Sequence, residues 1–124
     1  MEDFRTELSD RLLDFAVGCV KLSFKLNQVA MGKALANQLL RSATSAGANY
    51  QEGCGAESLA DFVHKLQITL KELLESFWWL KVVARAEMIP SDQVRPLLNE
   101  SDELRRIIAK SVLTAKTRLA TSRK

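Results

Sequence analysis

Apolar side chains recur every three or four residues along four segments, which is the spacing of one face of an α-helix. The segments cover about residues 9–27, 33–53, 58–85 and 92–118. Ser58 and Ser91 stand where N-caps are expected, and the glycines of "GCG" at 53–55 are expected to stop the second helix in the left-handed conformation. Because short connections make consecutive helices antiparallel, the pattern predicts an all-α, up-down-up-down four-helix bundle. We expect residues 1–124 to form this bundle as a single domain, with a frayed tail at 119–124.

The second predicted helix is unusual because its later half, "RSATSAGANYQEG" at residues 41–53, contains no Leu, Ile, Val, Met or Phe. Small side chains allow neighbouring helices to approach closely. Arg41 and Glu52 lie about 16 Å apart along the helix axis and cannot pair with each other, so each needs a partner on another helix or another subunit if it is buried. Ser42 and Asn49 point nearer to the core, where polar groups require hydrogen bonds. We therefore expect a helix that makes close contacts with polar specificity.

The third predicted helix carries more apolar surface than one core face requires. The run "FWWL" places Trp78 and Trp79 on different sides of the helix, and Val82 adds to the flank of Trp78. One interpretation is a wide core face with one tryptophan partly exposed. The other, which we favour, is a subunit interface formed by Trp78, Trp79 and Val82, since soluble monomers rarely expose large apolar patches. The sequence thus predicts a homo-oligomer.

Positive charge is concentrated at the end of the chain, although the net charge is only +3. No acidic residue follows Glu103, whereas seven lysines and arginines do. The candidates for binding nucleic acid are Arg105, Arg106, Lys110, Lys116 and Arg118, with weaker support for Lys21, Lys25 and Lys33. Such cations neutralise phosphates independently of base sequence. The alternative is an ordinary solvated helix end, where cations complement the helix dipole.

Few other chemistries fit the composition. His64 is the only histidine, so metal sites built on histidine pairs are excluded, and no glycine-rich phosphate loop of the GxxxxGKS type is present. We predict a protein that is not an enzyme and needs no metal or cofactor. Cys19 lies on an apolar helix face and is expected to be a small buried hydrophobe. The sequence shows no signal peptide and no 18-residue apolar run, so we expect a cytoplasmic protein without membrane contact.

The segment "QLLRSATSAGANYQEG" resembles the hallmark of the bacterial four-helix bundle family named for proteins encoded in 23S rRNA intervening sequences. That hallmark is Gln-Leu-x-Arg-Ser-Ala-x-Ser-Ile-x-x-Asn-Ile-x-Glu-Gly. The matching residues are Gln38, Leu39, Arg41, Ser42, Ala43, Ser45, Asn49, Glu52 and Gly53, and further matches are Ser58, Phe62, Leu66, Ile68 and Glu75. The chain departs from the family pattern at Ala46, Tyr50, Ala56 and Glu72.

The resemblance implies a homo-oligomeric bundle, with pentamers in the family, and association with RNA or another nucleic acid. A related branch works with the reverse transcriptase of diversity-generating retroelements, so a reverse transcriptase is a possible partner by analogy alone. We expect the motif polar residues, Glu75 included, to serve folding and assembly. Two hypotheses follow: a nucleic-acid-binding oligomer, RNA being favoured, or a protein–protein scaffold that uses the exposed aromatic surface and has no nucleic-acid role.

Overall fold

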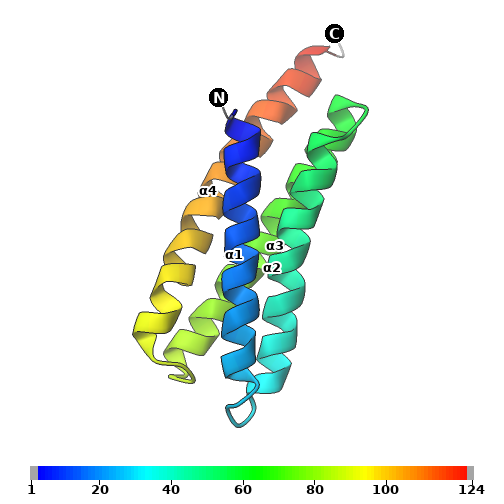
Figure 1. The fold of residues 1–124 in the computed structure, drawn as a ribbon. Coiled ribbons are helices and arrows are strands. Elements are labelled where there is room, and N and C mark those ends of the chain that lie inside the picture. Colours follow the sequence, from blue (N-terminus) through cyan, green and yellow to red (C-terminus); the bar gives the residue numbers. More distant parts are fainter. Residues whose placement is uncertain (1–2, 123–124) are drawn as a thin grey trace.

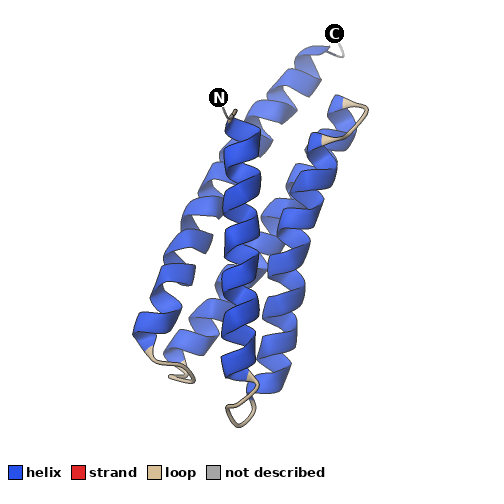
Figure 2. Cartoon of the chain, in the orientation of Figure 1, coloured by secondary structure: helices blue, strands red, loops and turns tan. Residues whose placement is uncertain are grey.

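The computed structural model describes residues 3–122, and these form four α-helices joined by short connections. The helices are α1 (Phe4–Leu26), α2 (Gly32–Cys54), α3 (Leu59–Arg85) and α4 (Ser91–Ser122). Consecutive helices run in opposite directions (Figure 1), and the remaining described residues are loops (Figure 2). The predicted four-helix bundle is confirmed. The start of α1 and the end of α4 lie at the same end of the bundle.

Helix boundaries largely follow from local capping, but Ser91, expected as an N-cap, is the first residue of α4 itself. Ser58 accepts a hydrogen bond from the backbone N–H of Asp61 at 3.0 Å, as expected of an N-cap. The glycines at the end of α2 do not adopt the expected left-handed conformation. Gly55 has a φ of −96°, and no glycine of the described residues has a positive φ. Gly53 is needed for steric reasons instead, since a Cβ at this position would lie only 3.0 Å from the Cβ of Lys65. Gly53 thus allows α2 to approach α3 closely.

The last helix is longer than the sequence pattern predicts. It remains helical to Ser122, whereas fraying was expected from residue 119, and positions 123–124 lie outside the described residues. Leu119 packs against the hydrophobic core and so supports this last part of α4. The hydroxyl of Thr121 donates to the carbonyl of Thr117 at 3.0 Å, a further local contact. The helix therefore continues beyond residue 119 because Leu119 makes an apolar contact with the core.

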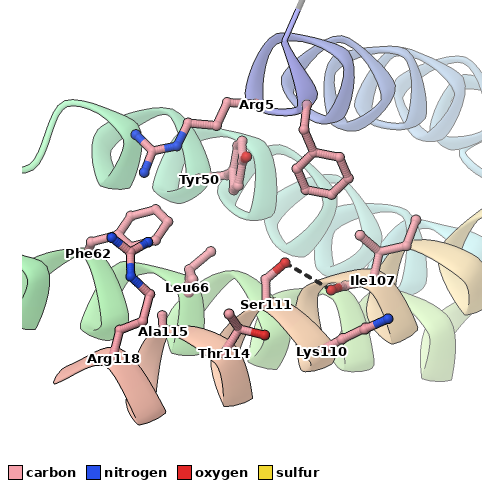
Figure 3. A pocket seen from close by; sticks show the side chains of 11 residues that line it. Arg5, Tyr50, Phe62, Leu66, Ile107, Lys110, Ser111, Thr114, Ala115 and Arg118 are labelled. Carbon is pink, nitrogen blue, oxygen red and sulfur yellow. Dashed lines mark hydrogen bonds between the residues drawn. The ribbon is translucent and has the colours of Figure 1, made fainter. Parts of the chain in front are cut away.

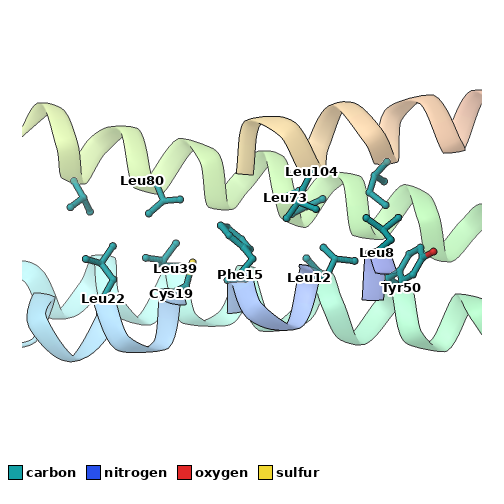
Figure 4. Packing of buried hydrophobic residues seen from close by; sticks show 14 of the residues in the cluster. Leu8, Leu12, Phe15, Cys19, Leu22, Leu39, Tyr50, Leu73, Leu80 and Leu104 are labelled. Carbon is teal, nitrogen blue, oxygen red and sulfur yellow. The ribbon is translucent and has the colours of Figure 1, made fainter. Parts of the chain in front are cut away.

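The core runs the length of the bundle, and leucine is its commonest residue (Figure 4). Its fully buried members include Leu12, Phe15 and Leu39. Cys19 is completely buried, as predicted, and burial raises the pKa of its thiol to about 12. Cys19 therefore packs as a neutral apolar side chain.

The four helices do not contact one another equally. α2 packs on α3, α3 on α4 and α1 on α2 extensively, whereas α1 and α4 meet only sparsely. On the α2–α3 contact the hydroxyls of Ser42 and Ser76 lie 2.8 Å apart in the core, and Ser76 also donates to the carbonyl of Glu72 at 2.9 Å. The small side chains of α2 are thus used inside the subunit, where they bring α2 close to α3.

Candidate functional site

Arg41 bridges two acidic residues of α3. Its guanidinium lies 3.1 Å from a carboxylate oxygen of Glu72 and also pairs with Glu75. The same Glu75 oxygen accepts a hydrogen bond from the indole N–H of Trp79 at 3.1 Å. Glu72 is buried, so its charge requires this partner. The partner that Arg41 needed on another helix therefore comes from within the same chain.

The other polar residues of the motif also make their contacts within the subunit. Glu52 pairs with Lys65 of α3 at 2.8 Å, which supplies its expected partner on another helix and raises the pKa of Lys65. The Asn49 amide donates to the backbone carbonyl of Ser45 at 2.9 Å and lies 3.1 Å from its hydroxyl. Together with Gly53, these contacts tie the later half of α2 to itself and to α3.

The two tryptophans of "FWWL" point to different sides, as predicted. Trp78 is 58% exposed, whereas Trp79 is half-buried, packs against the core and is held by its bond to Glu75. Val82 is half-buried and lines a shallow hollow with Trp78, and the ammonium of Lys81 lies 5.7 Å from the centre of a Trp78 ring. The predicted interface residues therefore do not form one surface, since only Trp78 and Val82 share this flank.

A second exposed apolar face lies on α1 and was missed by the sequence analysis. Leu13 is 61% exposed and Phe24 is 66% exposed, while Val17 is also exposed and Val20 half-buried. At about 100° per residue these four side chains fall within roughly 60° of one another. Their spacing of four, three and four residues is a helical signal that could have been found. The sequence analysis overlooked this second apolar face because α1 already has a complete core face.

The five candidate cations of α4 do not form one patch. The Arg105 Nε donates to Asp102 at 2.9 Å, and its guanidinium lies 5.0 Å from the centre of the Phe77 ring. Arg106 pairs with the same Asp102 at 3.2 Å. Both arginines are thus partly neutralised by an acid one turn earlier. Within residues 3–122, Lys116 makes no ion pair and is exposed.

Lys110 and Arg118 have a different environment, because both line a pocket of about 480 Å³ between α4 and the start of α1 (Figure 3). Arg5 of α1 joins them, and its guanidinium lies 4.7 Å from the centre of the Phe62 ring. No residue described as lining this pocket is acidic. The structure therefore brings together three cations from two helices, of which the sequence analysis had named two.

The weaker candidates are spread over other parts of the molecule. Lys25, in the last turn of α1, donates to the side chain of Gln93, near the start of α4, at 2.7 Å. Lys21 and Lys33 are exposed. None of the described helices is long and apolar enough to span a membrane.

The family model of the 23S rRNA-intervening sequence protein matches residues 7–110, which is most of the chain. The chain belongs to this family. A similar solved structure is that of a protein of unknown function from the S23 ribosomal protein family of Bacteroides thetaiotaomicron. It shares 37% sequence identity with a TM-score of 0.80, covering 85% of this chain and 97% of that chain. No curated protein matches this member of the family. The predicted resemblance is confirmed.

Proposed function

We propose that this protein is a non-enzymatic, homo-oligomeric helical bundle of the cytoplasm that binds nucleic acid, preferentially RNA. The observation that carries the proposal is the group of cations formed by Arg5, Lys110 and Arg118. In the described part of the chain these three side chains make no ion pair, and no acidic residue lines their pocket. Their charge is therefore available to phosphate groups.

Self-association is supported by apolar surface on two helices. Leu13, Val17 and Phe24 of α1 and Trp78 of α3 are all exposed large hydrophobics. Faces of this kind are typical of subunit interfaces. A symmetric oligomer would repeat the cations of each subunit around a ring or face, and a pentamer is the form that family resemblance favours.

The test is RNA affinity measured as a function of salt. Each phosphate contact that is lost reduces the salt slope by about 1, so Lys110→Gln and Arg118→Gln should each do so. Arg105→Gln is the matched control, because the charge of Arg105 is already paired with Asp102. Absence of binding at low salt, or affinity indifferent to salt, would refute the nucleic-acid function.

Oligomerisation is tested separately by native mass spectrometry and light scattering. The wild-type protein should be an oligomer, and Phe24→Ser or Trp78→Ser should lower the subunit number at equal concentration. A wild-type monomer at working concentration would contradict self-association.

The second candidate function is a protein–protein scaffold without a nucleic-acid role. It is favoured by the exposure of Trp78 beside Lys81, an aromatic and cationic surface typical of binding hot spots. Retention of one defined protein after nuclease treatment, lost on Trp78→Ser while the subunit number stays unchanged, would support the scaffold over self-association.

A further inference from the structure

The pocket between α1 and α4 has an apolar floor. Three buried side chains form its base, and Figure 3 shows them among the other side chains that line the pocket. They are Tyr50, Leu66 and Ala115. Phe4, which is exposed, and Phe62 supply aromatic walls. Its volume of about 480 Å³ lies within the range of about 300–1,000 Å³ that is usual for small-molecule sites. The pocket can therefore take one flat, apolar chemical group.

The rim of this pocket is cationic. Arg5, Lys110 and Arg118 are exposed at its edge, and a guanidinium stacked on the ring of Phe62 places positive charge directly beside an aromatic wall. Asp3 is an acidic neighbour of Arg5, but its carboxylate caps α1 by accepting from the backbone N–H of Thr6 at 2.9 Å. An anionic group bound at the rim would meet cations from two helices.

Hydroxyl groups of α4 also line the pocket. Ser111 donates to the carbonyl of Ile107 at 3.1 Å, which leaves its oxygen able to accept a further hydrogen bond. Thr114 lines the pocket one turn away in the chain and is exposed. A ligand that suits all three zones has a flat body, polar edges and one anionic group.

We infer that this pocket binds one unpaired nucleotide, with the base against the apolar and aromatic side chains and the phosphate at the cationic rim. Base–aromatic stacking is largely independent of base identity, and cations that follow a strand supply the phosphate contacts. A base within a duplex is stacked and paired, so it cannot enter without being flipped out. The pocket would thus confer a preference for single-stranded over double-stranded RNA.

Two kinds of ligand have this chemistry: a nucleotide within an RNA chain and a free nucleotide. For RNA, the inference rests on the proposed function. The probes are a short single-stranded RNA with one internal 2-aminopurine, the duplex of the same sequence, and free 2-aminopurine ribonucleoside monophosphate. Fluorescence reports stacking of the modified base, and filter binding reports affinity for each RNA.

Two substitutions fill the pocket and a third serves as their control. Ser111→Phe adds a ring at a half-buried position of the pocket lining, and Thr114→Phe adds one at an exposed lining position, where the fold is easier to preserve. Thr117→Phe adds the same ring to an exposed position of α4 outside the pocket. Circular dichroism confirms that each variant is folded before binding is measured.

We expect the wild type to quench 2-aminopurine in single-stranded RNA and to bind the duplex at least about tenfold more weakly. Ser111→Phe and Thr114→Phe should abolish the quenching and weaken single-strand binding about tenfold, whereas Thr117→Phe should change neither. If the protein quenches only the free 2-aminopurine monophosphate and not the RNA, and Ser111→Phe abolishes that quenching, the ligand of the pocket is a free nucleotide. That result would refute RNA as the source.

Other outcomes separate the inference from the proposed function. Salt-dependent RNA binding that is equal for single strand and duplex, and unaffected by either pocket-filling variant, would overturn the nucleotide pocket and leave the proposed function intact. Absence of binding to every RNA and to the free monophosphate would overturn both.

Discussion

Arg41→Gln tests whether the motif arginine serves the fold or a ligand. In the native chain its guanidinium lies between the carboxylates of Glu72 and Glu75 on α3. Glutamine keeps a polar side chain of moderate length but removes the positive charge. Two carboxylates one helical turn apart would then face each other without a cation, and one of them, Glu72, is buried. The fold should lose stability for electrostatic reasons.

The size of the loss follows from how exposed the charges are. Removing one partner of a fully buried pair costs about 3–5 kcal/mol, whereas an exposed pair contributes about 0–1 kcal/mol. Here the side chain of Arg41 is 50% exposed and that of Glu72 only 10%, so solvent screens one partner and hardly reaches the other. The expected decrease in the free energy of unfolding is between these limits, about 1–3 kcal/mol.

Urea unfolding followed by circular dichroism measures this decrease, at several protein concentrations because assembly contributes to apparent stability. Arg11→Gln is the matched control: Arg11 also meets two carboxylates, those of Glu100 and Glu103 on α4, which are both more exposed than Glu72. It should cost less than about 1 kcal/mol. Combining Arg41→Gln with Glu72→Gln should recover part of the loss, because no buried charge then lacks a partner.

Unchanged stability in Arg41→Gln, together with lost RNA binding, would refute this account. The arginine would then belong to a ligand site, and its contacts with Glu72 and Glu75 would be incidental to the fold.

Three further predictions concern two glycines and the cysteine thiols. Gly47→Ala should raise the free energy of unfolding by about 0.5–1 kcal/mol, because a Cβ there would lie 3.7 Å from that of Leu12, an ordinary contact, while alanine favours the helix. Gly32→Ala should lower it by about 1–3 kcal/mol, since the added atom would lie 2.0 Å from a carbonyl oxygen at the end of α1. At pH 8, iodoacetamide should modify half-buried Cys54 at least about tenfold faster than Cys19, whose pKa is raised by burial to about 12; equal rates in peptide mass spectra would contradict this.

Hydrophobic periodicity predicted the four helices well because each one buries a long apolar face. It says less about the rotation of α3 about its own axis, on which Val83 is buried in the core. The reason is that Thr69 and Ser76 also face inward on α3, where Thr69 donates to the carbonyl of Lys65 and Ser76 meets Ser42 of α2. Short polar side chains that bond within their own helix or across a close contact do not register in a pattern of apolar residues.

The pocket could not be predicted from the sequence because its cations lie far apart along the chain. Arg5 belongs to the first turn of α1, while Lys110 and Arg118 belong to α4, and only the closed bundle brings them together. The pairing of Arg105 with Asp102 was readable, since an acid three residues earlier on a helix is a neighbour. A count of positive charges alone overstated what that part of α4 offers to phosphate groups.

The α2–α3 contact and the α1–α4 contact should have different roles, the first in stability and the second in RNA binding. The α2–α3 contact contains the motif pairs and the small residues, whereas α1 and α4 touch sparsely and leave the pocket between them. Lys110 lies on the second contact and shares no ion pair with Arg41. The stability effects of Arg41→Gln and Lys110→Gln should therefore add within about 0.5 kcal/mol, and only the second should lower the salt slope of RNA binding. A non-additive double variant would mean that the two contacts communicate through the core, and the separation would fail.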